Sequence, residues 1–170
     1  MHSITEEFTE VLELISSSLT QQNLEISDFQ KLYSTQLYLK KGDVDRAQRF
    51  LLQIIQTSLK IPKKKYLPVI TYVFLARALI EARNLRFDAA LSLSRQAQTL
   101  AQQSNQENLI STANQLFERL NVQKKTLELY EVIDKDKTDI AQFKENLISE
   151  VRTYLLNVKD LIEQEKQSSE

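Results

Sequence analysis

The stretch Leu39-Lys-Lys-Gly-Asp-Val-Asp-Arg-Ala47 decides the expected fold of this chain. Its Gly42 is the single glycine among 170 residues and accepts the positive φ that stops a helix, after which Asp43 can start the next one. A second stretch, Leu79-Ile-Glu-Ala-Arg-Asn-Leu-Arg-Phe-Asp-Ala-Ala90, shows the same helix-turn-helix pattern. A hairpin that cannot bury its apolar face alone must stack on a neighbour, so the two copies predict a repeat scaffold.

The length and composition predict an all-α chain of one domain, or of one domain plus an extended arm. One Gly and two Pro leave little material for the tight turns that connect strands. The absence of Cys excludes disulfides, thiolate metal sites and cysteine nucleophiles. An apolar content of 42% is ample for a folded core.

Charge and hydropathy give expectations about partners and location. The net charge is −1 with acids and bases interspersed, so nucleic acid is not expected as a main partner. The apolar run from Val69 to Ile80 contains Arg77 and is well below the ~20 residues that span a bilayer. Glu6, Glu7, Glu10 and Glu13 interrupt any signal-peptide-like run. We therefore expect a cytoplasmic protein without a membrane span.

Capping signals and apolar periodicity predict a series of helices. Ser3 opens the first, over roughly 3–22, and a capping box at Ser27-Asp-Phe-Gln30 opens the second, which runs to Lys41. Further helices are expected over about 43–60, over 86–104 and from 106 onward. Another is expected to run to about 83, with Pro68 near its first turn, where the missing N–H of proline does no harm. Asn84 is the expected turn residue, and Thr138 or Asp139 is expected to cap the last helix.

These residues resemble the tetratricopeptide repeats, in the longer form seen in kinesin light chains and some bacterial regulators. The residues that match the two copies are Tyr38, Gly42-Asp43, Ala47 and Leu51 in the first, and Leu75, Ala76, Ala90 and Ala97 in the second. Asn84 replaces the turn glycine, with one or two extra residues. The resemblance implies antiparallel helical hairpins stacked as a short α-solenoid over residues 27–135, preceded by a helix in 1–26.

The resemblance also implies where a partner would bind. The groove of such repeats is lined by the first helix of each pair, which transfers to Leu32, Gln36, Leu39 and Lys40 and to Val73, Arg77, Ile80 and Glu81. A partly apolar groove suits an amphipathic helix or an extended peptide. The alternative is that Leu32, Leu39, Val73 and Ile80 are core residues that face the next helix.

Residues 136–170 predict a long C-terminal helix. Ile140, Leu147, Tyr154 and Leu161 recur every seven residues, as in a coiled coil that would make a homo-oligomer. Leu155, Leu156, Ile148 and Ile162 widen this stripe, which is typical of a helix that caps the repeats instead. Both alternatives are open at this point.

The residues with reactive or charged side chains do not form a catalytic pattern. His2 is the single histidine, and there is no glycine-rich phosphate loop, so neither an enzyme activity nor a metal or other cofactor is expected. The cluster Lys60-Ile-Pro-Lys-Lys-Lys65 is expected as a loop, in which Lys63, Lys64 and Lys65 could contact phosphate, an acidic peptide or anionic lipid. The alternative is a solvated loop without a ligand. The sequence thus predicts a protein-binding adaptor. The alternative is an oligomerising helical subunit of a larger assembly.

Overall fold

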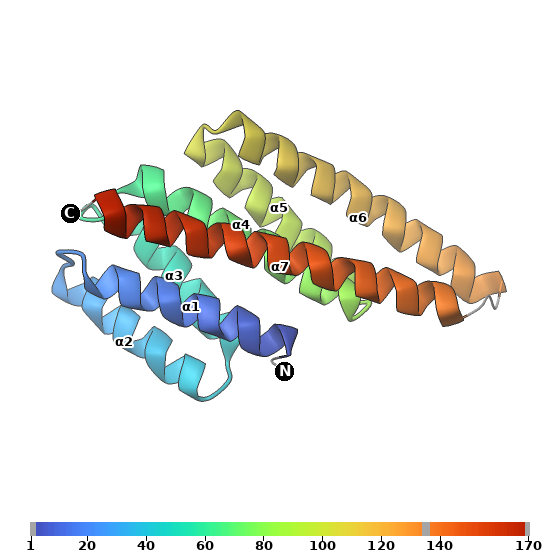
Figure 1. Ribbon diagram of the computed structural model, residues 1–170, viewed down its shortest axis with the longest axis horizontal. Helices are drawn as coiled ribbons and strands as arrows, with labels where there is room; N and C mark the ends of the chain where they lie inside the picture. Colours follow the sequence, from blue (N-terminus) through green and yellow to red (C-terminus); the bar gives the residue numbers. More distant parts are fainter. Residues whose placement is uncertain (1–2, 134–136, 169–170) are drawn as a thin grey trace. The chain divides into compact units, whose positions relative to one another are not determined.

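The computed structural model describes residues 3–133 and 137–168, which form helices and no strand (Figure 1). The helices are α1 (Ile4–Thr20), α2 (Ile26–Lys40), α3 (Val44–Thr57), α4 (Lys63–Arg83), α5 (Phe87–Ser104), α6 (Glu107–Ile133) and α7 (Lys137–Ser168). The all-α class predicted from composition is therefore confirmed over the described ranges.

The chain forms two compact units. Unit 1 contains the residues up to Ile70 and those from Leu155 onward, and unit 2 contains Thr71–Tyr154. Helices α4 and α7 therefore contribute to both units, whereas α1–α3 belong to unit 1 and α5–α6 to unit 2. These units do not coincide with the segments 1–26, 27–135 and 136–170 expected from the sequence, because the two ends of the chain share unit 1.

Unit 1 is built on the antiparallel pair α2–α3, against which α1 packs (Figure 1). A buried hydrogen bond of 2.5 Å between the hydroxyls of Ser18 and Tyr66 joins the end of α1 to the beginning of α4. The core of the unit consists of large aliphatic and aromatic side chains that are almost completely buried: Phe8, Leu12, Ile15, Leu19, Leu32, Leu51, Ile54, Ile55, Tyr66 and Ile70.

Unit 2 is built on the antiparallel pair α5–α6 (Figure 1). Its core is rich in small residues, which let helices approach closely. The completely buried alanines are Ala76, Ala78, Ala82, Ala90, Ala97, Ala101 and Ala113. Ala47 in unit 1 is also fully buried, so both alanines that mark the predicted turns face the interior.

The turn between α2 and α3 closes as a Schellman motif. Gly42 has a φ of +80°, and its N–H donates to the Leu39 carbonyl at 3.1 Å. The Asp43 N–H donates to the Tyr38 carbonyl at 2.9 Å, so two carbonyls at the end of α2 are satisfied. The Asp43 side chain then accepts from the Arg46 N–H at 3.1 Å and caps α3, as predicted.

The turn between α4 and α5 repeats this hydrogen-bond pattern. Leu85 has a φ of +62° and donates to the Ala82 carbonyl, and Arg86 donates to the Glu81 carbonyl, both at 2.9 Å. Leu85 follows Gly42 by 43 residues, the spacing that also separates Ala47 from Ala90. Asn84 lies in this turn, as predicted, but it does not take the place of Gly42, and the predicted extra residues are absent. The left-handed position falls on Leu85, and the two turns match without an insertion.

Several predicted helix ends also need correction. Helix α2 begins at Ile26 after Glu25, whose carbonyl accepts from Asp28 and Phe29, so the expected capping box at Ser27 does not form. Helix α3 ends at Thr57 and not near 60, because Ser58 adopts extended backbone. Helix α4 begins five residues before Pro68, which therefore lies inside the helix and not in its first turn.

The two left-handed turn residues generate a reciprocal prediction. A Cβ added at Gly42 meets nothing within 4 Å, so Gly42→Ala strains the backbone without a clash and should lower the free energy of unfolding by about 1–2 kcal/mol. Leu85→Gly relieves the same strain, but it removes a side chain that is only 41% exposed and adds freedom to the unfolded chain. Its free energy of unfolding should therefore change by less than about 1 kcal/mol. Urea denaturation of both variants measures the difference. A loss in Leu85→Gly as large as that in Gly42→Ala would contradict the backbone argument.

Adjacent alanines on α5 test the close packing in unit 2. Ala90 is fully buried, so Ala90→Leu should overpack the helix contact and lower the free energy of unfolding by about 1–3 kcal/mol. Ala89 is exposed on the same turn of helix, and Ala89→Leu serves as the matched control, with an expected change within about 0.5 kcal/mol. Equal effects in the two variants would contradict the packing argument.

Candidate functional site

The predicted groove residues of unit 1 divide between the core and the surface. Leu32 and Leu39 are buried, as the core alternative expected, whereas Gln36 and Lys40 are exposed. Gln36, Leu39 and Lys40 line a shallow cavity of about 290 Å³ between α2 and α1, together with Glu13, Ser16 and Ser17. At the wall of this cavity, the Gln36 side-chain amide donates to the Ser16 hydroxyl at 3.3 Å. The structure therefore brings part of the predicted groove together.

A line of large apolar side chains lies on the outer face of α2. Phe29 is 43% exposed, Tyr33 64% and Leu37 39%. Their spacing of four residues keeps them on one face of the helix, next to the edge that carries Gln36 and Lys40. We call Phe29, Tyr33 and Leu37 the α2 stripe. The four-residue spacing of these side chains is visible in the sequence, yet none of the predicted site residues belongs to the stripe.

The predicted groove residues of unit 2 are largely inaccessible. Val73, Ile80 and Glu81 are buried, and the side chain of Arg77 is 12% exposed. The Glu81 carboxylate accepts from the Arg77 Nε at 3.2 Å and from the Arg86 Nε on its other oxygen. This ion pair joins the last turn of α4 to the beginning of α5, so Arg77 and Glu81 stabilise the turn in this structure.

The electrostatics of Glu81 reflect this arrangement. Burial raises the pKa of Glu81, but the hydrogen bond from Arg86 and the charges of Arg77 and Arg86 outweigh it and hold the pKa below its usual 4.5. A carboxyl group with a lowered pKa in the folded protein stabilises it at neutral pH. That stabilisation is lost as the pH falls through the pKa of the folded state.

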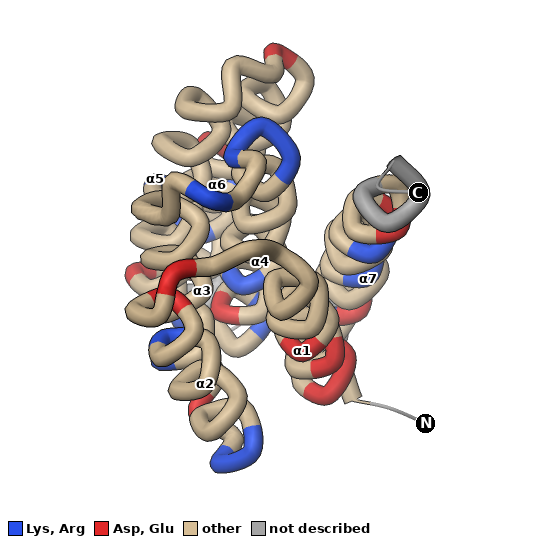
Figure 2. The backbone as a smooth tube through the Cα atoms, turned by 90° about the vertical axis from the view of Figure 1, so that its left-hand side faces the viewer, with Lys and Arg blue, Asp and Glu red and all other residues tan. Residues whose placement is uncertain are grey.

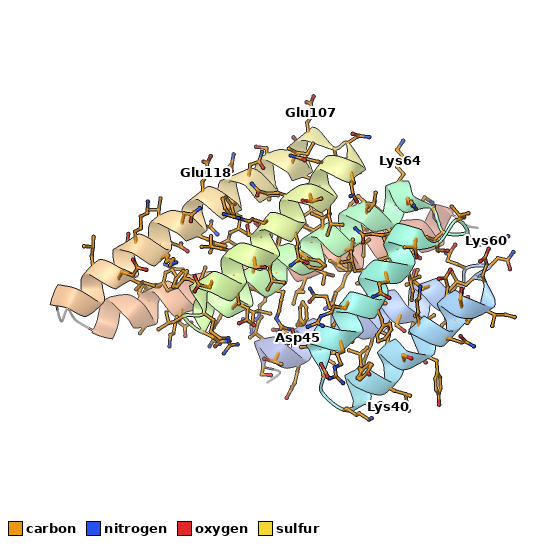
Figure 3. The ribbon with its side chains drawn as sticks, turned by 180° about the vertical axis from the view of Figure 1, so that it is seen from behind. Lys40, Asp45, Lys60, Lys64, Glu107 and Glu118 are labelled. Atoms are coloured by element: carbon orange, nitrogen blue, oxygen red, sulfur yellow. The ribbon has the colours of Figure 1, made fainter. Side chains whose placement is uncertain are left out.

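The predicted anion contacts lie in a helix and not in a loop. Lys63, Lys64 and Lys65 form the first turn of α4, and all three are exposed. The Lys64 side chain extends away from the helices, as does Lys60 in the connection before it (Figure 3). Pro62 starts this helix, because its carbonyl accepts from the N–H groups of Lys65 and Tyr66.

The apolar face of α7 is buried within the chain. Leu147, Val151, Tyr154 and Val158 are all less than a tenth exposed, as the capping alternative expects. Within unit 2, two pairs of aromatic rings join α7 to other helices: Tyr154 lies near Tyr72 of α4, and Phe143 lies near Phe87 of α5. Glu150 of α7 also forms an ion pair of 2.6 Å with Arg119 of α6. Burial, followed by the Glu150 charge, raises the pKa of Tyr154 to about 12, so it stays neutral in this core. Oligomerisation through α7 stays a prediction.

Among the residues that the structure describes, no three His, Asp or Glu side chains lie close enough together to hold a metal ion. His2 and the charged residues 134–136 lie outside the described residues. No helix in the described ranges is long and apolar enough to cross a membrane.

The ion pair of Glu81 generates a pH-dependent prediction. Glu81→Gln should lower the free energy of unfolding by about 1.5–3 kcal/mol at neutral pH, because hydrogen bonds to a charged group are lost. The difference from the wild type should shrink as the pH is lowered below 4.5, where the carboxylate becomes protonated. Thermal denaturation across this range measures it, with exposed Glu118→Gln (Figure 3) as the control. A pH-independent difference would show that the charge of Glu81 is unimportant.

Comparison with known proteins finds no match to this chain among protein-family models, curated proteins or solved structures.

Proposed function

We propose that this chain is a non-enzymatic adaptor that binds an amphipathic helix of a partner protein along α2 of unit 1. The observation that carries the proposal is the α2 stripe, in which Phe29, Tyr33 and Leu37 lie in line on an exposed helix face. Scattered exposed apolar residues are normal in proteins, but aligned large ones are typical of interaction surfaces.

The geometry of the stripe suits a helical partner. Phe29 and Leu37 are eight residues apart, which corresponds to about 12 Å along the helix axis. Ridges formed by residues four apart pack into the grooves between the equivalent ridges of a second helix. A partner helix with apolar side chains at positions i, i+3 or i+4, and i+7 would therefore cover the stripe.

Polar groups beside the stripe would orient the partner. The cavity between α1 and α2 carries Glu13 on one wall and Lys40 on the other, with the Gln36 amide between them. Acidic residues recur along α1, whereas α2 is uncharged along most of its length (Figure 2). Gln36 and Lys40 keep their predicted role as partner contacts in this proposal. Leu32 supports the surface from the core, and Val73, Arg77 and Glu81 take no part in it.

The repeat character of the chain supports the same assignment. The hydrogen-bond pattern at Gly42 recurs at Leu85, and the buried alanines Ala47 and Ala90 follow these turns at the same distance. In a tetratricopeptide-like arrangement, which we propose for these hairpins, α2 is the first helix of its pair. The first helices line the groove in that family, and α2 carries both the stripe and the cavity residues.

The triple variant Phe29→Ser/Tyr33→Ser/Leu37→Ser tests this function. A photo-crosslinking residue at position 33 of the wild type would identify the bound protein, and calorimetry with the purified partner would measure the affinity. We expect the triple variant to bind at least ~30-fold more weakly, because each lost apolar contact at an interface centre costs about 1 kcal/mol or more. The peptide that crosslinks should be helical when bound.

The double variant Val122→Ser/Leu129→Ser is the matched control. These two side chains of α6 are 62% and 61% exposed, so the control removes comparable apolar surface from unit 2. Its affinity should equal that of the wild type, and circular dichroism should show that all the variants are folded. A triple variant that binds like the wild type, or a control that weakens binding equally, would refute the assignment of α2.

A further inference from the structure

A second surface with a distinct chemistry lies at one end of unit 1. There, the connection between α1 and α2 meets the connection between α3 and α4. The Tyr66 hydroxyl at the beginning of α4 bonds to Ser18 near the end of α1, and the Gln22 amide of the next connection donates to it at 3.5 Å. These contacts hold the two connections at the same end of the unit, away from the turn at Gly42.

Two strongly exposed aliphatic side chains lie at this end. Leu59, in the connection that precedes α4, is 87% exposed, and Ile26, the first residue of α2, is 78% exposed. They are more exposed than any other large apolar side chain in the described part of the chain. Leu59 lies outside the α2 stripe, whereas Ile26 lies one turn before Phe29 on the same side of α2, at the end of the stripe.

Four lysines surround Leu59. Lys60 follows it directly, and Lys63, Lys64 and Lys65 form the first turn of α4, where the helix dipole already supplies partial positive charge. All four side chains are exposed, and Lys60 and Lys64 project outward (Figure 3). Two exposed carboxylates lie in the neighbouring segments of the unit, Glu25 before α2 and Glu163 in α7, where Leu161 and Ile162 line a small cavity with Lys65. The four lysines outnumber these two carboxylates.

We propose that this end of unit 1 docks on the surface of an anionic lipid bilayer. The lysines would contact lipid phosphates and carboxylates, and Leu59 and Ile26 would enter the boundary between headgroups and acyl chains. Clustered lysines next to an anionic bilayer and a few inserted apolar side chains each add to the affinity of peripheral proteins. We call Ile26, Leu59, Lys60, Lys63, Lys64 and Lys65 the basic tip.

The aliphatic side chains favour a bilayer over other anions. A free phosphate ion would engage lysines and backbone N–H groups but would leave Leu59 and Ile26 without a role. An acidic polypeptide would likewise need only the charges. Only a ligand with negative headgroups over an apolar interior matches both halves of the basic tip. This inference is independent of the helix-binding function proposed for α2.

Vesicle co-sedimentation of the full chain tests the proposal. We expect binding to vesicles of phosphatidylcholine mixed with phosphatidylserine, weakening as salt is raised, and little binding to phosphatidylcholine alone. The variant Lys63→Gln/Lys64→Gln/Lys65→Gln should lower the partition coefficient about 100-fold, at about fivefold for each lysine. Leu59→Ser/Ile26→Ser should lower it at least about tenfold, because apolar burial is lost.

The control variant Lys41→Gln/Arg49→Gln/Lys125→Gln changes the net charge equally with exposed residues beyond the basic tip. It should bind within about twofold of the wild type if contact with the tip, and not overall charge, causes binding. The α2 stripe variant should also bind vesicles normally. Circular dichroism would show that every variant is folded.

Several results would overturn the proposal. They are no binding to mixed vesicles, equal loss in the control variant, or an unchanged partition coefficient after the Leu59 and Ile26 substitutions. Displacement by inorganic phosphate at constant ionic strength would assign the lysines to free anions instead. Binding to polyglutamate without binding to vesicles would assign them to an acidic protein.

Discussion

Left-handed backbone at three positions in the described part of the chain closes the connections α2–α3, α4–α5 and α5–α6. Gly42, Leu85 and Asn105 have positive φ, and each directly follows, or lies within two residues of, the end of a helix. A chain with one glycine must place other residues in this strained conformation, and asparagine tolerates it better than leucine does. The carbonyls satisfied at these turns, and the core that each hairpin then buries, offset the strain at Leu85.

The hairpins depend in turn on small side chains. Ala47 and Ala90 follow their turns at the same distance and are completely buried, so the helices that carry them can pack closely. The longer helices α4 and α7 supply residues to both units, which gives each unit more apolar surface than its own hairpin contains. In unit 2, the ion pairs of Glu81 with Arg77 and Arg86 connect the end of α4 to the beginning of α5. They therefore stabilise the turn in which Leu85 has an unfavourable backbone conformation.

The two proposed surfaces of unit 1 differ in the physical terms that would drive binding. The α2 stripe is flanked by groups of both signs, so its affinity would come from apolar burial, with Gln36, Glu13 and Lys40 setting orientation. The basic tip combines two aliphatic side chains with four lysines, so its affinity would depend strongly on salt. A protein with both surfaces could hold a partner helix at a membrane, with each contact strengthening the other through effective concentration.

The sequence by itself determined the helical class, the positions of the turns and the small residues that the turns bring inside. Local signals were sufficient because Gly42 and Asp43 act through backbone geometry and hydrogen bonds within the turn itself. They failed at Asn84, because the conformation of Leu85 is imposed by packing on both sides of the turn and not by its own preference. Tertiary structure alone decided which predicted groove residues are accessible. Periodicity shows that Leu32 and Val73 lie on a helix face, but only the packed neighbours decide whether that face meets protein or solvent.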